Sequence, residues 1–117
     1  MSFDPRRLDI YRLSLRLSAR VHELTEAFPR GETLRDQLRR SAQSVFLNLS
    51  EGLGHPSKGV KRRAFSVSQG ELAETRAALD LAFAQGLIER GDFDGCEETA
   101  DRIAAMLWRL VRTLNPR

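Results

Sequence analysis

Residues 34–54, LRDQLRRSAQSVFLNLSEGLG, constrain the fold more than any other stretch of the chain. Apolar side chains recur there at steps of three and four, which is the spacing of one face of an α-helix. This stripe consists of Leu34, Leu38, Ala42, Val45, Leu49 and Leu53. An isolated helix with one apolar stripe is not stable in water, so it must bury that stripe against other helices.

Three further segments show apolar stripes at helical spacing, and no stretch alternates as a β-strand would. The expected helices run from Asp4 or Asp9 to Ala27, from Lys58 to Gln85, and from about Asp92 to a stop at Asn115-Pro116. Short connectors containing Gly and Pro separate them. The sequence therefore predicts an all-α fold, an antiparallel up-down-up-down four-helix bundle, as a single domain over residues 1–117.

Two glycines of the third helix have predicted roles. Gly86 follows its last apolar residues and is expected to stop it. Gly70 lies in its interior, where glycine costs about 1 kcal/mol relative to alanine. That cost predicts close packing of another helix at Gly70.

The remaining composition narrows the class of protein. No apolar run reaches the roughly 18 residues of a membrane span, and the N-terminus lacks the apolar core of a secretory signal. The single cysteine, Cys96, excludes an intrachain disulfide. We therefore expect a cytoplasmic protein with no membrane partner.

No arrangement of residues indicates catalysis. The two histidines, His22 and His55, do not follow a glutamate by three positions, so the ligand pattern of di-iron bundles is missing. Cys96 lies on an apolar stripe, and no serine sits in a nucleophile elbow. The sequence predicts a protein that is not an enzyme and has no metal or other cofactor.

A second stripe on residues 34–54 is polar. Ser44, Asn48 and Glu51 share one side of the helix, and Glu74 lies on the next predicted helix. Because buried polar groups need partners, we interpret these four residues as a packing network between helices. A site for a ligand or a partner is the alternative.

The charge is uneven along the chain. Residues 1–65 contain 13 Lys and Arg against 7 Asp and Glu, whereas residues 66–117 contain 6 against 9. Arginine and lysine clusters bind phosphates and release counterions, so RNA or DNA is a possible partner. The candidate contacts are Arg35, Arg39, Arg40, Lys58, Lys61, Arg62 and Arg63. The alternatives are a solvated face, or a protein-interaction scaffold that binds no nucleic acid.

Several apolar residues fall outside the stripes. They are Phe46, Leu47, Val67, Leu81 and Trp108. Single exposed apolar residues are ordinary, but a patch of them marks contacts between proteins. We expect this set to form an interface between copies of the chain.

Residues 37–52 also resemble the signature of a known family. The run Gln37-Leu38-Arg39-Arg40-Ser41-Ala42, then Ser44-Val45, Asn48-Leu49 and Glu51-Gly52, is similar to the signature Q-L-R-R-A-A-x-S-I-x-x-N-I-A-E-G of the 23S rRNA intervening-sequence protein family, also called the four helix bundle protein family. Phe28-Pro29, Leu8-Asp9-Ile10-Tyr11 and Gly70-Glu71-Leu72-Ala73-Glu74 resemble further elements of that family.

The resemblance implies a cytosolic bacterial four-helix bundle that assembles into a ring-like homopentamer. Some members are encoded in insertions of ribosomal RNA genes, and a related branch binds nucleic acid and a reverse transcriptase. Most members have no established activity. This chain departs at Phe46 and Leu47, where the family often has Pro and a small residue, and at Glu71, where Ser is frequent.

Overall fold

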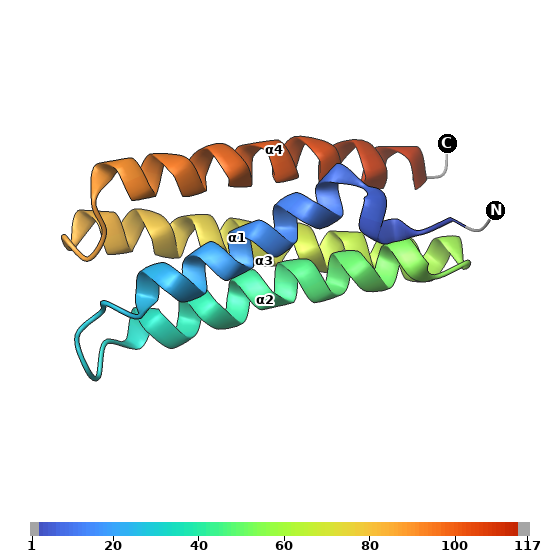
Figure 1. Cartoon of the computed structure of the whole chain (residues 1–117). Helices are drawn as coiled ribbons and strands as arrows, with labels where there is room; N and C mark the ends of the chain where they lie inside the picture. Colours follow the sequence, from blue (N-terminus) through green and yellow to red (C-terminus); the bar gives the residue numbers. More distant parts are fainter. Residues whose placement is uncertain (1–2, 115–117) are drawn as a thin grey trace.

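The computed structural model describes residues 3–114, which form four α-helices and no strand. The helices are α1 (Asp9–Thr25), α2 (Thr33–Gly54), α3 (Lys58–Ala84) and α4 (Arg90–Leu114), preceded by a short 3-10 helix, η1 (Pro5–Arg7). Consecutive helices run in opposite directions, and η1 lies at the same end of the bundle as the last described turn of α4 (Figure 1). The predicted all-α, up-down-up-down four-helix bundle is confirmed.

Of the two candidate starts of the first helix, Asp9 begins α1, and Asp4 caps the separate 3-10 helix. The Asp4 carboxylate accepts a hydrogen bond of 3.0 Å from the Arg6 backbone N–H and begins η1. Leu8 is extended, so α1 begins separately at Asp9. The helix ends at Thr25, two residues before the expected Ala27, because Phe28 turns into the core.

The end of α3 agrees with the prediction, whereas the start of α4 does not. Gly86 has φ +75° and donates to the Phe83 carbonyl at 3.0 Å, which confirms it as the stop after α3. The fourth helix starts at Arg90 rather than at Asp92, so Asp92 lies inside its first turn. The predicted stop at Asn115-Pro116 lies outside the described residues.

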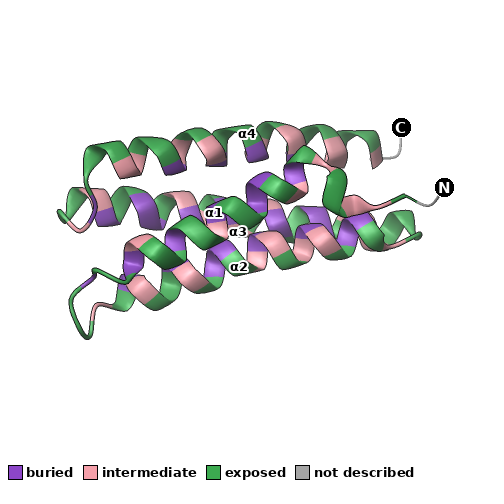
Figure 2. Cartoon of the chain, viewed as in Figure 1, coloured by how far each residue is buried: buried purple, intermediate pink, exposed green. Residues whose placement is uncertain are grey.

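The apolar stripes of the four helices meet in a common core (Figure 2). All six stripe residues of α2 are buried, and Val45 and Leu49 have no exposed surface. The largest buried side chains from the other helices are Leu17, Phe65, Leu79, Ile103 and Leu107. No helix within residues 3–114 is long and apolar enough to cross a membrane.

Close helix packing occurs at Gly52, and the expectation for Gly70 was wrong within this chain. A Cβ added at Gly52 would lie 2.5 Å from Cε1 of Phe65, so α2 and α3 approach closely there. A Cβ at Gly70 would meet no heavy atom within 4 Å. Gly70 is exposed on the outside of α3, where the chain itself offers no neighbouring helix.

Candidate interaction surfaces and a pocket

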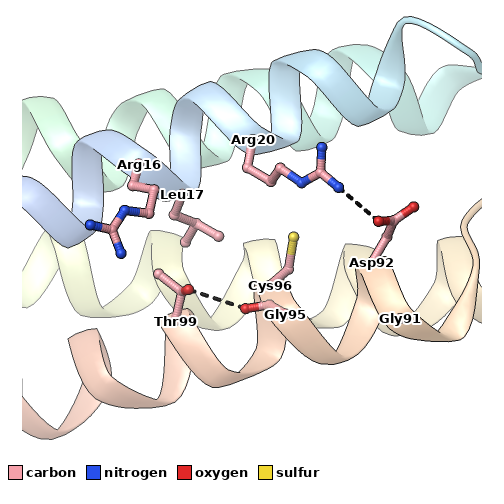
Figure 3. Close-up of a pocket in the computed structure, with 8 residues that line it drawn as sticks. All are labelled: Arg16, Leu17, Arg20, Gly91, Asp92, Gly95, Cys96 and Thr99. Carbon is pink, nitrogen blue, oxygen red and sulfur yellow. Dashed lines mark hydrogen bonds and ion pairs between the residues drawn. The ribbon is translucent and has the colours of Figure 1, made fainter.

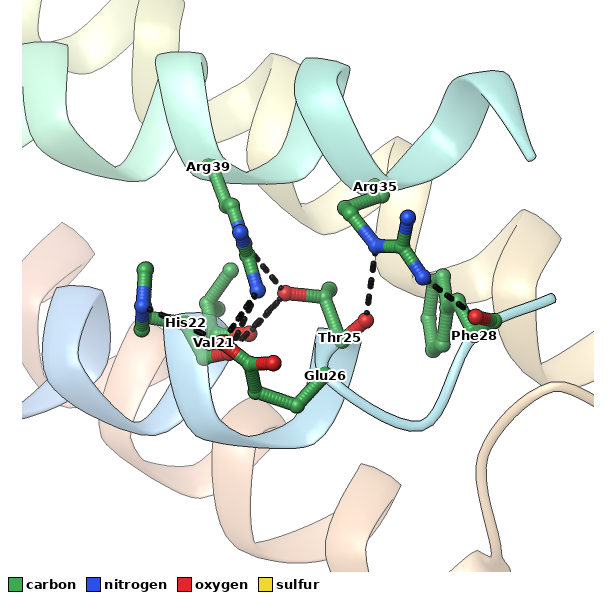
Figure 4. A network of polar contacts seen from close by, with 7 residues as sticks. All are labelled: Val21, His22, Thr25, Glu26, Phe28, Arg35 and Arg39. Atoms are coloured by element: carbon green, nitrogen blue, oxygen red, sulfur yellow. Dashed lines mark hydrogen bonds and ion pairs between the residues drawn. The ribbon is translucent and has the colours of Figure 1, made fainter. Parts of the chain in front are cut away.

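Two of the expected nucleic-acid contacts hold the end of α1 (Figure 4). Nε of Arg35 donates to the Thr25 carbonyl at 3.0 Å, and its Nη2 donates to the carbonyl of Phe28. Nε of Arg39 donates to Thr25 Oγ1 at 2.8 Å, and its Nη2 donates to the His22 carbonyl at 3.1 Å. The last carbonyls of a helix lack intrahelical donors and carry partial negative charge. Arg35 and Arg39 of α2 therefore cap α1 from outside.

The role of Thr25 as the acceptor for Arg35 and Arg39 was not predicted from the sequence. Its hydroxyl is buried and donates to the Val21 carbonyl at 2.8 Å while it accepts from Arg39. Glu26 also lies within 3.2 Å of Arg39 Nη2. A threonine in the last turn, followed ten and fourteen residues later by arginines, was the available signal.

The start of α3 contains two more capping cations. Lys61 Nζ donates to the carbonyls of Gly52 and Leu53 at 2.7 and 3.3 Å, which caps the end of α2. Arg62 donates from Nε and Nη2 to the Leu114 carbonyl at 3.2 and 3.0 Å, which caps the last described turn of α4. These two side chains connect α3 to the ends of both neighbouring helices.

The other three expected contacts are more accessible. Arg40 Nη2 pairs with the Glu74 carboxylate at 2.8 Å across α2 and α3, and its Nη1 lies 3.8 Å from Glu71. Lys58 and Arg63 are exposed and have no carboxylate within ion-pair distance among residues 3–114. Of the seven candidates, only Lys58 and Arg63 thus have uncommitted charge in that part of the chain.

The four residues of the expected polar network do not all bond to one another: Ser44 and Asn48 are bonded within α2, and Glu74 has other partners. Asn48 Nδ2 donates to the carbonyl and the Oγ of Ser44 at 2.9 and 3.0 Å, both within α2. Glu74 binds Arg40 and accepts from Gln37 at 3.3 Å, nearer the start of α2. Glu51 is exposed and makes no side-chain hydrogen bond with the described residues.

A different set of polar groups joins α2 to α3 inside the bundle. Thr75 Oγ1 donates to Ser41 Oγ at 2.9 Å, and Ser68 Oγ donates to the Val45 carbonyl at 2.8 Å. All three hydroxyl-bearing residues are fully buried. Ser68 and Thr75 fall on the core stripe of α3, seven residues apart, and this spacing was the signal that sequence reasoning missed.

Four of the five expected interface residues are exposed. The exposed fractions are 62% for Leu47, 43% for Val67, 47% for Leu81 and 55% for Trp108. Phe46 is half-buried, because its ring packs edge-to-face on Tyr11 with the centroids 4.9 Å apart. Phe46 therefore packs partly against its own chain, whereas Leu47 is exposed to solvent.

A pocket of about 230 Å³ lies between α1 and α4 (Figure 3). Its lining is Arg16, Leu17, Arg20, Gly91, Asp92, Gly95, Cys96 and Thr99. Burial raises the pKa of the Cys96 thiol, so the thiol stays protonated at neutral pH. Hydrogen bonding to Glu23 raises the pKa of Arg20, whose Nη2 also lies 2.7 Å from Asp92. Over residues 3–114, no three His, Cys, Asp or Glu side chains are grouped to bind a metal ion.

Comparison with known families now identifies the chain. A model of the family described as 23S rRNA-intervening sequence protein matches residues 6–109. The chain belongs to this family. The match covers all four helices except the last residues of α4, and it confirms the resemblance that the motif of α2 indicated.

A solved structure has a similar fold. The chain is similar in structure to a protein of unknown function from the S23 ribosomal protein family of Bacteroides thetaiotaomicron VPI-5482. The TM-score is 0.81 at 19% sequence identity, over 87% of this chain and 97% of the other. At this identity the similarity supports the fold alone. No curated protein matches the chain.

Proposed function

We propose that this chain is a non-enzymatic, cytoplasmic bacterial scaffold that assembles with further copies of itself through the outer side of α2 and α3. The observation that carries the proposal is the exposure of Leu47 and Val67 beside a glycine without a neighbour. Val67 lines a hollow of about 160 Å³ with Asn48 and Glu51 of α2, and Leu47 precedes Asn48 in the sequence. Neighbouring apolar groups on the surface are typical of contacts between proteins.

Gly70 supports the same surface. Glycine inside a helix costs about 1 kcal/mol relative to alanine, and nothing in the described chain requires its lack of a side chain. It lies on α3 one turn after Val67. A second copy that packs closely on this side of α3 gives Gly70 the role that the chain's own helices do not. A closed ring of five copies is the arrangement that the family resemblance implies.

Sedimentation velocity at micromolar concentration tests self-assembly. We expect a species several times heavier than the 13.3 kDa chain. Leu47→Glu should shift it toward the monomer, and Gly70→Leu should do the same while the helix itself is retained. Arg7→Glu is the control, because Arg7 is exposed and belongs to η1 rather than to α2 or α3. A stable 13.3 kDa species for the parent chain would contradict the proposal.

Nucleic-acid binding is a second candidate function, and the unpaired arginines of α1 and α4 favour it. Arg12, Arg16, Arg102 and Arg109 are exposed and have no ion-pair partner among residues 3–114. Arg16 and Arg109 line hollows between α1 and α4, and Arg102 lies at helical spacing between Thr99 and Met106, which also line them. A row of uncommitted cations binds phosphates without reading sequence, and assembly would multiply weak contacts.

Titration with structured RNA and duplex DNA at several salt concentrations tests this candidate. The triple variant Arg12→Glu/Arg102→Glu/Arg109→Glu should weaken binding and flatten the dependence on salt, by about 0.9 in log–log slope for each phosphate that it no longer neutralises. Arg30→Glu, in the loop before α2, is the control and should change little. If the parent binds neither nucleic acid near physiological salt, the alternative of a protein-interaction scaffold is preferred.

A further inference from the structure

We propose that the pocket between α1 and α4 binds a small organic oxyanion, a carboxylate or a phosphate monoester with a compact apolar body. This goes beyond self-assembly and nucleic-acid binding, because the site lies between two helices of one chain. Four features carry it: a cavity, an uncommitted guanidinium, an apolar floor, and two glycines that no packing contact explains.

The charges of the pocket select an anion. Arg20 is committed, since it hydrogen-bonds Glu23 and lies 2.7 Å from Asp92 at the rim. Arg16, one turn earlier on α1, lines the same cavity and has no carboxylate partner in residues 3–114. One positive charge is therefore left over in the lining. A guanidinium fork matches the two oxygens of a carboxylate or phosphate.

The floor selects an organic ligand over a bare ion. Leu17 and Cys96 are 1% and 2% exposed, and they close the cavity toward the core (Figure 3). The raised pKa of Cys96 leaves a neutral thiol there. A cavity of about 230 Å³ is smaller than the roughly 300–1,000 Å³ of drug-sized sites, so it suits a small ligand with an apolar body.

The α4 wall is open because two of its residues are glycines. Gly91 and Gly95 are one turn apart, and a Cβ at either would meet no heavy atom within 4 Å. Gly95 lies inside the helix, where glycine costs about 1 kcal/mol of helix stability relative to alanine. No contact within the described chain explains this cost. These glycines leave space in front of α4 and give access to the backbone N–H groups of its first turn.

The experiment measures binding of benzoate and of phenyl phosphate to the full chain by calorimetry, with benzyl alcohol as the uncharged analogue. We expect at least one anion to bind and the alcohol not to bind; the tighter anion identifies the preferred head group. Arg16→Gln should weaken binding about tenfold or more, because it removes a charge-assisted hydrogen bond. Arg12→Gln removes an equally unpaired arginine that does not line the pocket, and it should leave binding unchanged.

A second variant tests the site by filling the pocket with a side chain. Gly95→Leu places a side chain in open space, and leucine is the better helix former, so the protein should fold at least as well as the parent. It should nevertheless fail to bind the anion. The inference is overturned if the parent binds neither anion, or if Gly95→Leu binds them as well as the parent does. Because Gly95 is distant from Leu47, sedimentation of the same variant tests assembly separately.

Discussion

Four cations of α2 and early α3 have a different role from four arginines of α1 and α4. Arg35, Arg39, Lys61 and Arg62 each donate to the last carbonyls of another helix. Arg12, Arg16, Arg102 and Arg109 are exposed and have no ion-pair partner in residues 3–114. Four of the seven expected nucleic-acid contacts therefore donate to helix ends, whereas Lys58 and Arg63 keep uncommitted charge within residues 3–114.

Whether a cationic side chain caps a helix or stays available to a partner depends on the acceptors within its reach. A helix end exposes carbonyls that need donors, and a long cationic side chain from the next helix reaches them. Arginines facing solvent along a helix meet no such acceptor, so their charge stays available to a partner. Stability measurements on matched variants of the two regions should separate these roles.

The largest effect is expected for Arg39→Met, which keeps the apolar stem and removes the charge. Arg39 is mostly buried, with 23% of its side chain exposed, and it contacts Thr25, His22 and Glu26. Hydrogen bonds from charged groups contribute about 1.5–3 kcal/mol, so the free energy of unfolding should fall by about 2 kcal/mol in urea denaturation. A loss below about 0.5 kcal/mol would mean that the cap is dispensable.

Lys61→Met should have the next largest effect. Its ammonium group donates to two carbonyls at the end of α2, and water can replace part of this contact. We expect the free energy of unfolding to fall by about 1 kcal/mol. Lys58→Met is the matched control from the same turn, because Lys58 is exposed and contacts no acceptor among residues 3–114. Equal losses of stability in the two variants would argue against capping.

Arg40→Gln should cost still less, and salt should erase the difference. Arg40 pairs with Glu74 while 61% of its side chain is exposed, so about 0.5 kcal/mol is expected at low salt. At 1 M NaCl the screening length is about 3 Å, and the variant should match the parent. The loss of stability from Arg39→Met should persist at that salt concentration, because Arg39 is largely shielded from solvent.

The smallest effect is expected for Arg12→Met, in the solvent-facing region. Surface substitutions away from caps and ion pairs usually change the free energy of unfolding by less than about 0.5 kcal/mol. We expect the denaturation midpoint of this variant to lie within error of the parent. A loss of stability as large as that of Arg39→Met would remove the distinction between the two regions.

The fold was largely predictable because periodicity reports directly on burial. All six apolar residues of the α2 stripe are in the core, and Gly86 stops α3 as expected. The shortened α1 and the earlier start of α4 were not predictable, since they depend on where Phe28 and Glu89 pack or cap in three dimensions.

The surfaces were harder to predict, because spacing along one helix does not reveal the partner on the next. Leu47 and Val67 were correctly expected to lie outside the core stripes. Asn48 and Glu74 do not meet in a common network, whereas the buried Ser41–Thr75 bond was missed. The pocket between α1 and α4 was also missed, since it requires two helices distant in sequence.

Capping from a neighbouring helix also affects how the bundle opens. Helix ends ordinarily fray, and their amide protons exchange with solvent even while the core is intact. Here the last described turn of α4 is held by Arg62, 52 residues away in the sequence, and the end of α2 is held by Lys61 beside it. The final turns of α2 and α4 detach only when their hydrogen bonds from Lys61 and Arg62, at the start of α3, are broken. Amide exchange in these three segments should therefore slow together, as a single cooperative unit at one end of the molecule.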